Sequence, residues 1–177
     1  MSKCLICENE YLPFVDFGDM PIANAFAIKE EMDDEYTFPM KVGFCDGCNM
    51  VQLAEQPDRE KMFHENYAFF SSTSNYMVEH FKNFAHSVSD LQSLDSESLV
   101  VEIGCNDGIM LQNFLKDKIP CLGVEPSKNV AEVAMGKGIE VINQFFDQPL
   151  AEKITQTYQK ADAILSANVM CHIPYMH

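Results

Sequence analysis

The sequence lacks any hydrophobic run long enough to cross a membrane as a helix, which takes roughly 20 apolar residues. Its first ten residues, MSKCLICENE, lack the apolar core of a secretory signal. No internal repeat and no low-complexity linker interrupts the 177 residues. We therefore expect a cytoplasmic protein with no membrane partner, made of ordinary folded modules.

Basic residues are also scarce. The chain has 12 Lys and Arg residues against 27 Asp and Glu residues, which gives a formal net charge of −15. An acidic surface repels phosphate backbones, so no nucleic-acid partner is expected, and we interpret the charge as a contribution to solubility. Hydrophobic residues still make up 47% of the chain, which is enough for a folded core and excludes global disorder.

Cysteine is plentiful, and four of the seven cysteines form two C-x2-C pairs. Cys4 and Cys7 form the first pair, and Cys45 and Cys48 form the second. A two-residue gap lets both thiolates of a pair reach one ion from a tight turn, and two such turns complete a tetrahedron. A reducing compartment argues against disulfides, and four soft thiolates favour Zn²⁺ in a closed, structural site. The alternatives are a coincidental spacing or a redox C-x-x-C motif, although neither pair lies beside a βαβ pattern.

Three regions follow from the residue patterns. Residues 1–58 contain both cysteine pairs and no helical period, which predicts a small zinc-binding module of short strands and loops. Residues 59–97 are predicted to form a mainly helical connector, capped at Ser74 or Asn75. Its expected apolar stripe consists of Met77, Phe81, Phe84, Val88 and Leu91.

Residues 98–177 alternate short apolar runs with helical patterns. We expect strands at 99–104, 121–126, 139–143 and 161–169, and helices at 109–118, 129–137 and 149–159. This alternation predicts an α/β fold with a parallel sheet and right-handed crossovers.

A glycine-containing loop, GCNDG at 104–108, follows the first of these strands. Gly104 permits a tight turn, and Gly108 allows a ligand or a helix to approach closely. The pattern is G-x-N-x-G and not the dinucleotide pattern G-x-G-x-x-G, so it suits a ligand without phosphates. Glu102, just before the loop, can accept a hydrogen bond from a ligand ammonium or order the loop.

Glu125 ends the second expected strand, 21 residues after Gly104. An acidic residue about 20 residues beyond the loop is the usual holder of a ribose diol. Loop, acid and strand order together predict a nucleoside site at the carboxyl ends of the strands. The alternative is a tight turn followed by a surface glutamate.

Taken together, these blocks resemble the S-adenosylmethionine (SAM)-dependent sugar C-methyltransferases that act on nucleotide-linked deoxysugars. The resemblance covers the whole chain, through the cysteine pairs and the segments NYAFFSSTSNYMVEHF, VVEIGCNDGIML, GVEPS, VINQFFDQPLAEKI and SANVMCHIPY. It implies a zinc-binding N-terminal domain, a Rossmann-like methyltransferase domain, SAM and Zn²⁺ as cofactors, and a nucleotide-sugar substrate.

The resemblance also implies site residues. Tyr67 and His172 lie in blocks that approach the sugar, where either side chain can act as a base or stabilise an enolate. The alternative for Tyr67 is simple core packing, and the alternative for His172 is a helix-start or packing histidine. The residues expected around SAM are Glu102, Gly104, Asn106 and Gly108 at the methionine end, Glu125 at the ribose, Phe146 beside the adenine, and Asn168 facing the cofactor.

Family members are longer, and their C-terminal half carries further strands and a second α/β domain. We therefore expect residues 98–177 to be the first half of a Rossmann-like sheet, with an open apolar edge at its innermost strand. Missing C-terminal sequence or another chain would complete it, and the chain alone is not expected to turn over substrate. Two other functions fit less well: a non-catalytic zinc-containing binding module, and a Rossmann oxidoreductase, which the short loop suits poorly.

Overall fold

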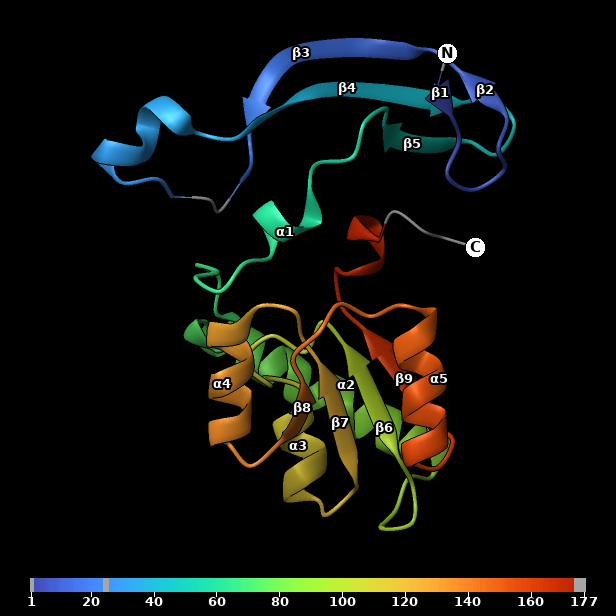
Figure 1. The fold of residues 1–177 in the computed structure, drawn as a ribbon. Coiled ribbons are helices and arrows are strands. Elements are labelled where there is room, and N and C mark those ends of the chain that lie inside the picture. The colour runs from blue at the N-terminus through green and yellow to red at the C-terminus, as the bar shows by residue number, and fades with distance from the viewer. Residues whose placement is uncertain (1, 24–25, 174–177) are drawn as a thin grey trace. The chain divides into compact units, whose positions relative to one another are not determined.

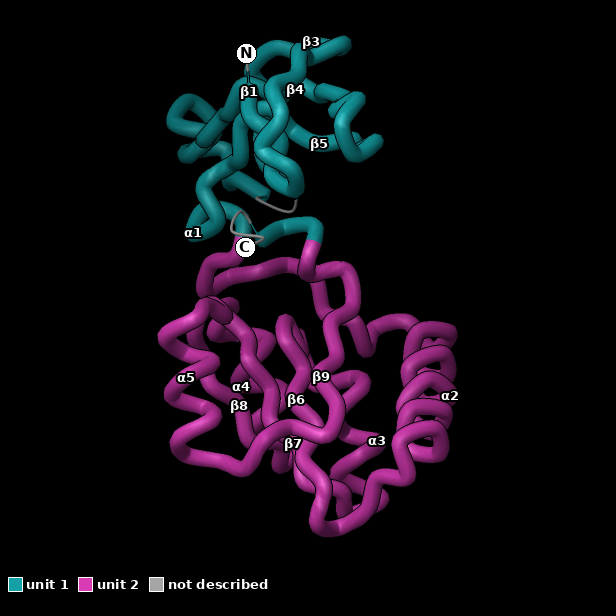
Figure 2. The backbone as a smooth tube through the Cα atoms, turned by 90° about the vertical axis from the view of Figure 1, so that its right-hand side faces the viewer, with its two compact units in different colours: residues 1–62, 171–177 teal, residues 63–170 magenta. Residues whose placement is uncertain are grey.

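A computed structural model describes residues 2–23 and 26–173 of the chain. These residues belong to two units, which Figure 2 distinguishes by colour. Unit 1 comprises residues 1–62 and 171–177, and unit 2 comprises residues 63–170. Each unit has its own core and is described separately below.

Unit 1 is built from antiparallel strands and loops, as expected from its lack of helical period, but its two longest strands have nine residues each and are not short. β1 (Ser2–Lys3) pairs with β2 (Glu10–Tyr11), and a second sheet has the order β3-β4-β5. The bounds of that sheet are β3 (Pro13–Pro21), β4 (Thr37–Cys45) and β5 (Met50–Leu53), with the 3-10 helix η1 (Lys29–Asp34) between β3 and β4 and the helix α1 (Arg59–Met62) after β5. The two cysteine pairs lie in the turns between β1 and β2 and between β4 and β5.

Unit 2 has the alternating strand and helix order that the sequence predicts. The four strands form one parallel sheet of order β8-β7-β6-β9. Their bounds are β6 (Val100–Ile103), β7 (Cys121–Val124), β8 (Glu140–Ile142) and β9 (Ala163–Ser166). The helices are α2 (Asn75–Gln92), α3 (Leu111–Lys116), α4 (Lys128–Gly136) and α5 (Gln148–Thr157), and the short 3-10 helices are η2 (Ser71–Thr73) and η3 (Met170–His172).

The sheet of unit 2 is covered by helices on both faces. One hydrophobic cluster joins the sheet to α2, α3 and α4 through residues such as Ala85, Phe114 and Ala134. A second cluster joins the other face to α5 through Leu150 and Ile154. Figure 1 shows α4 and α5 on opposite sides of the strands. Such a three-layer arrangement positions ligands at the carboxyl ends of the strands.

The face that α2 presents to the sheet differs from the predicted stripe. Ala85 is fully buried, and Phe81 and Val88 pack beside it, whereas Phe84 is 44% exposed and Leu91 is 80% exposed. The small side chain of Ala85 lets the helix approach the sheet closely. A stripe defined by large apolar side chains does not include this alanine. The helix also occupies only part of the predicted connector, because residues 63–70 contain no helix.

The N-cap of α2 is Ser74, one of the two predicted candidates, and its hydroxyl accepts a hydrogen bond from the Met77 amide. Helix α5 is capped by Asp147, whose carboxylate accepts from the Leu150 amide, and a proline follows in the first turn. Both caps satisfy amide donors that a helix start leaves without intrahelical partners.

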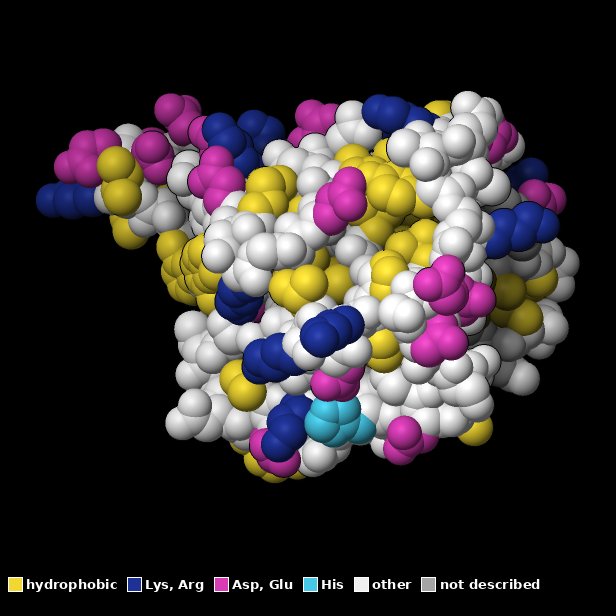
Figure 3. All heavy atoms as spheres, turned by 90° about the horizontal axis from the view of Figure 1, so that it is seen from below, with side chains coloured by type: hydrophobic (Ala, Val, Ile, Leu, Met, Phe, Trp, Pro, Cys, Tyr) yellow, Lys and Arg dark blue, Asp and Glu magenta, His cyan; other side chains and the backbone are white. Residues whose placement is uncertain are grey.

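Strand β6 is central, with β7 on one side and β9 on the other. Within the described residues, β9 pairs only with β6, and its Ile164 side chain is 65% exposed. The expected open apolar edge is therefore present in this structure. On the molecular face drawn in Figure 3, acidic and basic side chains are interspersed rather than segregated. None of the helices in residues 2–23 and 26–173 combines the length and hydropathy of a membrane span.

Candidate metal centre and cofactor site

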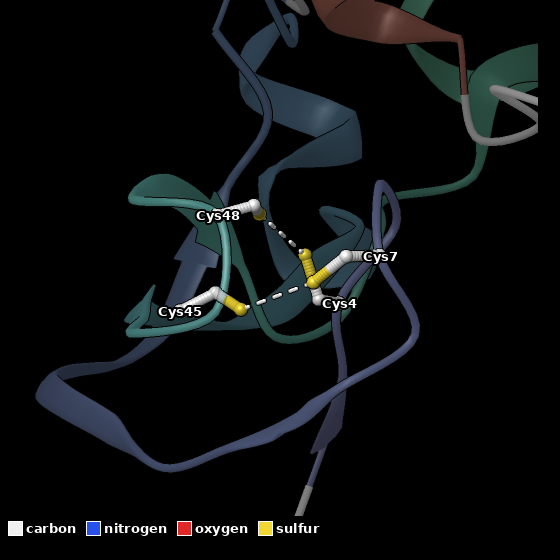
Figure 4. A group of neighbouring side chains, drawn as sticks. All are labelled: Cys4, Cys7, Cys45 and Cys48. Carbon is white, nitrogen blue, oxygen red and sulfur yellow. Dashed lines mark hydrogen bonds between the residues drawn. The ribbon is translucent and has the colours of Figure 1, made fainter.

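The four predicted metal ligands converge in unit 1. The Sγ atoms of Cys4, Cys7, Cys45 and Cys48 all lie within 4.8 Å of one another. Figure 4 shows the side chains pointing toward a common centre, with 3.5 Å separating Cys4 from Cys48 and Cys7 from Cys45. A tetrahedral Zn²⁺ with bonds of about 2.3 Å requires sulfurs about 3.8 Å apart, so this cluster fits the metal.

The two cysteine turns have the same backbone geometry. In each turn, the residue after the second cysteine has a left-handed conformation: Glu8 has φ 59° and Asn49 has φ 61°. The Glu8 amide donates to the Cys4 carbonyl at 3.0 Å, and the Asn49 amide donates to the Cys45 carbonyl at 2.8 Å. Each of these matching turns places its two thiols on the same side of the backbone, which is the arrangement that a shared ion requires.

Gly47 lies between Cys45 and Cys48, where a glycine usually serves a tight turn, but here it makes room for a neighbouring side chain. A Cβ at Gly47 would lie 2.0 Å from the Asn9 side-chain nitrogen, so the absent side chain makes room for Asn9. The left-handed conformation falls instead on the residue that follows Cys48.

Gln52 supports the cluster, and no sequence pattern marks it. This β5 side chain is buried, and its amide donates to the Cys4 Sγ at 3.1 Å while its oxygen accepts from the Leu5 amide at 2.9 Å. Tyr11 packs against Gly43 in β4 and donates its hydroxyl hydrogen to the Leu53 carbonyl. These contacts hold the first cysteine turn against the strands that carry the second.

The electrostatics of the cluster favour a cation. Burial opposes ionisation of Cys4, but hydrogen bonds from the Cys7 and Ile6 amides and from Gln52 lower its pKa to about 6. Burial together with the neighbouring thiols raises the pKa of Cys48 to about 12. Four thiolates therefore repel one another at this distance, and a divalent cation relieves that repulsion.

In unit 2, the glycine-containing loop connects β6 to α3. Gly104 has φ 69°, and a Cβ there would overlap the Val169 side chain, so both the turn and the packing require glycine. Gly108 has φ 76°, and a Cβ there would collide with Ile139 and approach Ala134 of α4. Gly108 was expected to allow close approach of a ligand or a helix, and in this structure the close neighbours are protein residues.

Glu125 lies at the carboxyl end of β7 and is 5% exposed. One carboxylate oxygen accepts from the Asn106 amide at 2.9 Å, and the other accepts from the Ser127 amide at 2.8 Å. The side chain thus ties the glycine-containing loop to the turn that begins α4. Burial raises its pKa despite these hydrogen bonds. The surface-glutamate alternative is excluded by this burial.

Two further carboxylates are buried beside it. Glu102 is 2% exposed and Asp107 is fully buried. Within residues 2–23 and 26–173, each has one oxygen without a hydrogen-bond partner, Oε2 of Glu102 and Oδ1 of Asp107. Burial, followed by the charges of Glu125 and Asp107, raises the pKa of Glu102 well above its ordinary value. A buried carboxylate oxygen that lacks a partner is costly, so this group of acids is suited to a positively charged ligand group.

Residues 67–73, which precede α2, are fastened to the same edge of the sheet. Asn106 accepts from the Ser71 amide at 2.9 Å and donates to the Phe69 carbonyl at 3.0 Å. Asp107 accepts from both the amide and the hydroxyl of Ser72. The Asn129 side chain of α4 donates to the Tyr67 carbonyl at 2.8 Å. No sequence pattern marks Asp107 or Asn129 as an anchor, although Asp107 lies inside the glycine-containing loop.

The remaining predicted residues are more scattered. Asn168 follows β9 with φ 56° and is exposed. Phe146 packs on the hydrophobic cluster beneath α5. The Tyr67 ring contacts Phe63, with centroids 5.6 Å apart. His172 ends η3 and is grouped with unit 1, so the two predicted catalytic residues fall in different units.

The parallel sheet, the short glycine-containing loop and the acid at the end of β7 define the class of domain: a nucleoside-binding α/β domain of the SAM-dependent methyltransferase type, here accompanied by a Cys4 zinc module. The chain belongs to the methyltransferase domain family, whose model matches residues 78–177. A family model of zinc-binding domains matches residues 4–63.

A characterised relative agrees with this assignment. The chain is 27% identical to the C-methyltransferase NovU of Streptomyces niveus over 179 aligned residues, which cover 100% of the chain and 42% of the relative. The chain thus spans less than half the length of this relative. SAM is the cofactor of the methyltransferase domain, and Zn²⁺ is the metal of the Cys4 cluster.

Proposed function

We propose that the protein is a SAM-dependent C-methyltransferase that acts on a nucleotide-linked keto-deoxysugar. The observation that carries this proposal is the convergence of Glu102, Asp107 and Glu125 on one short glycine-containing loop, where two buried carboxylate oxygens have no hydrogen-bond partner among the described residues. SAM carries an ammonium and a sulfonium, both positive, and no phosphate. A dinucleotide would instead bring its pyrophosphate to three acids, which argues against the oxidoreductase alternative.

The proposed cofactor contacts follow the edge of the sheet. Glu102, Gly104, Asn106 and Gly108 surround the methionine end, and Glu125 accepts from the ribose hydroxyls with the lone pairs that its two amide bonds leave free. Phe146 borders the adenine, and Asn168 faces the cofactor from the end of β9. The half-buried position of Phe146 after β8 is compatible with this role and with simple packing.

SAM supplies an electrophilic methyl group. The chain must then supply a base that removes a proton from the carbon next to the sugar ketone, so that this carbon forms a bond to the methyl as the methyl–sulfur bond breaks. His172 is one candidate, because partial burial lowers its pKa and leaves a neutral imidazole ready to accept a proton near pH 7. Tyr67 is the other, as a base or as a hydrogen-bond donor to the enolate oxygen.

Turnover is proposed to need more than these residues. The exposed edge of β9 is compatible with further strands, whether from the same polypeptide or from another chain. Cytoplasmic location is part of the proposal and is favoured by cysteines that, within the described residues, are not joined in disulfides.

One observation favours a second candidate, a non-catalytic binding module. Leu12, Phe14 and Phe17 are each more than half exposed along unit 1, which is unusual for a surface without a partner. This candidate predicts a stable complex and no affinity for SAM.

Methyl transfer is the direct test. A protein of the natural length is incubated with SAM carrying a ¹³C-labelled methyl group and a panel of nucleotide-linked keto-deoxysugars. A carbon-bound methyl resonance in the product supports the proposal, and an oxygen-bound methyl resonance would refute C-methylation while retaining methyl transfer. Label that never leaves SAM, together with no affinity for SAM, would favour the binding module.

A further inference from the structure

Residues 67–73 are held at both ends by hydrogen bonds to residues at the carboxyl edge of the sheet. At one end, Asn129 in the first turn of α4 holds the Tyr67 carbonyl. At the other end, Asn106 and Asp107 in the glycine-containing loop hold Phe69, Ser71 and Ser72. Between these anchors, Glu125 binds the amides of the same loop and of the turn before α4. All of these residues belong to unit 2.

The attachment uses side chains of the loop and of α4 that hydrogen-bond to the backbone of the segment. Phe69 is 53% exposed, and neither Phe69 nor Phe70 belongs to either hydrophobic cluster of unit 2. Asp107 makes the charged contact, because one of its oxygens accepts from both the amide and the hydroxyl of Ser72. A buried carboxylate that accepts two hydrogen bonds is a stronger anchor than a neutral amide.

Asp107 is itself held in place. The Lys137 ammonium, from the end of α4, donates to the Asp107 carbonyl and lies 3.9 Å from its Oδ1. This second oxygen has no hydrogen-bond partner within the described residues, although the side chain is fully buried. The anchor of the 67–73 segment is thus part of the same loop that is proposed to receive the cofactor.

We propose that Asp107, assisted by Asn106 and Asn129, is a positioning residue that couples cofactor binding to the placement of the 67–73 segment and hence of Tyr67. The inference rests on the proposed function, because it takes SAM to be the ligand of the glycine-containing loop. A ligand that orders the loop orders the segment, and a segment that is fastened in advance lowers the entropic cost of ligand binding.

The chain contains no tryptophan, which makes a specific optical reporter possible. Replacing the exposed Phe69 with tryptophan gives one emitter on the segment itself. S-adenosylhomocysteine, the demethylated product of SAM, is the probe ligand, added to the zinc-loaded chain that carries Phe69→Trp. Hydrogen exchange at the Ser71 and Ser72 amides, read by NMR in the chain without the reporter, provides an independent measure of attachment.

In the chain with native anchors, the ligand is expected to shift the tryptophan emission and to slow exchange at Ser71 and Ser72. Asp107→Ala is expected to speed exchange at Ser72 at least tenfold without ligand and to weaken ligand binding at least tenfold. Asp107→Asn is expected to recover most of both effects, because an amide oxygen still accepts from the Ser72 amide. Rescue by this conservative variant would not follow if Asp107 only supported the fold.

Asp162→Asn is the matched control. Asp162 also accepts a backbone hydrogen bond at a strand end, from the Leu99 amide at 2.7 Å, but at the opposite end of β6. The Asp162→Asn variant should leave the tryptophan emission and the hydrogen exchange at the Ser72 amide unchanged. If Asp107→Ala fails to fold, Asn129→Ala removes the anchor at Tyr67 and is expected to shift the emission in the same direction.

Unchanged exchange at Ser72 in Asp107→Ala would overturn the proposal, and so would ligand binding that never alters the tryptophan emission. Failure of the proposed function has a different signature, since the native chain would then bind no S-adenosylhomocysteine, while the Asp107→Ala effect on Ser72 exchange would persist. The two ideas can therefore fail separately.

Discussion

The two units are held together by different means. Among the described residues of unit 1, the buried hydrophobic side chains are Cys4, Tyr11, Ile22 and Cys45. All of these except Ile22 belong to one cluster, which consists of the four metal ligands and Tyr11. Unit 2 has two hydrophobic clusters, one on each face of its sheet. A small module that cannot bury enough apolar surface needs a metal, whereas an α/β layer structure does not. Stability and ligand chemistry are therefore separated here: the metal folds one unit, and buried acids prepare the other for a ligand.

The largest expected effect is the loss of unit 1 when its metal is removed. Cys45→Ser takes away a fully buried ligand, and structural zinc sites contribute on the order of 10 kcal/mol to folding. NMR spectra should then lose the dispersed signals of residues 1–62 and keep those of unit 2. Cys171→Ser, which changes an exposed thiol outside the cluster, is the control. Dispersed unit 1 signals in metal-free Cys45→Ser would contradict the account.

The next largest effect is a loss of stability in unit 2 that leaves the zinc content of unit 1 unchanged. Phe114 is 1% exposed in the cluster beneath α2 and α3, and Phe114→Ala is expected to destabilise unit 2 by about 3–5 kcal/mol. Chemical denaturation should show an earlier transition for unit 2, with zinc content unchanged. Leu91→Ala, at an 80% exposed position of α2, should change stability by less than about 0.5 kcal/mol. Zinc loss from Phe114→Ala would show that the units do not fold independently.

A smaller effect is expected from the buried amide beside the cluster. Gln52→Leu removes the hydrogen bond to the Cys4 Sγ and is expected to lower zinc affinity about 10–100-fold, as losing the outer hydrogen bonds of metal ligands commonly does. Competition with a chromogenic chelator measures this. Gln52→Glu keeps an acceptor for the Leu5 amide but places a negative charge near the thiolate, so it should bind zinc less tightly still. Equal affinities in all three proteins would refute a supporting role.

The smallest effect concerns the pH dependence of unit 2. Burial and the charges of Glu125 and Asp107 raise the pKa of Glu102 above its ordinary value of 4.5. Between the two pKa values, the folded state retains a proton that the unfolded state has lost, so stability falls as the pH rises through this window. Glu102→Gln stays neutral and should flatten this part of the profile while weakening S-adenosylhomocysteine binding.

Urea denaturation followed at several pH values above 4.5 measures the flattening, which should be smaller than the effect of Phe114→Ala. Parallel stability profiles for Glu102→Gln and the native chain would show that Glu102 titrates normally. The control is Glu132→Gln, at an exposed position of α4.

Much of this fold could be predicted from the sequence because its patterns are local. The β-branched runs followed by glycine marked β6, and the two C-x2-C pairs marked ligands that the structure brings within 4.8 Å of one another. The helix α2 was also found, but its buried contact is Ala85, and hydrophobicity ranks Leu91 above alanine although Leu91 is exposed.

The contacts that connect distant parts of the chain could not be predicted in this way. Gln52 reaches Cys4 across 48 residues, and Asn129 reaches the Tyr67 carbonyl across 62 residues. Neither residue type is rare, and neither carries a spacing that indicates a partner. Asp107 lies in the loop that sequence analysis recognised, but its bond to Ser72 depends on a segment that was expected to be helical.

The most direct test of the central claim is calorimetric titration of the zinc-loaded chain, and of a natural-length protein in parallel, with S-adenosylhomocysteine. We expect both proteins to bind, and Glu125→Ala to lower the affinity at least about tenfold, since hydrogen bonds to a charged group contribute about 1.5–3 kcal/mol. Absence of binding by both proteins, or undiminished binding by Glu125→Ala, would contradict the assignment of the β7 acid and the glycine-containing loop as a SAM site.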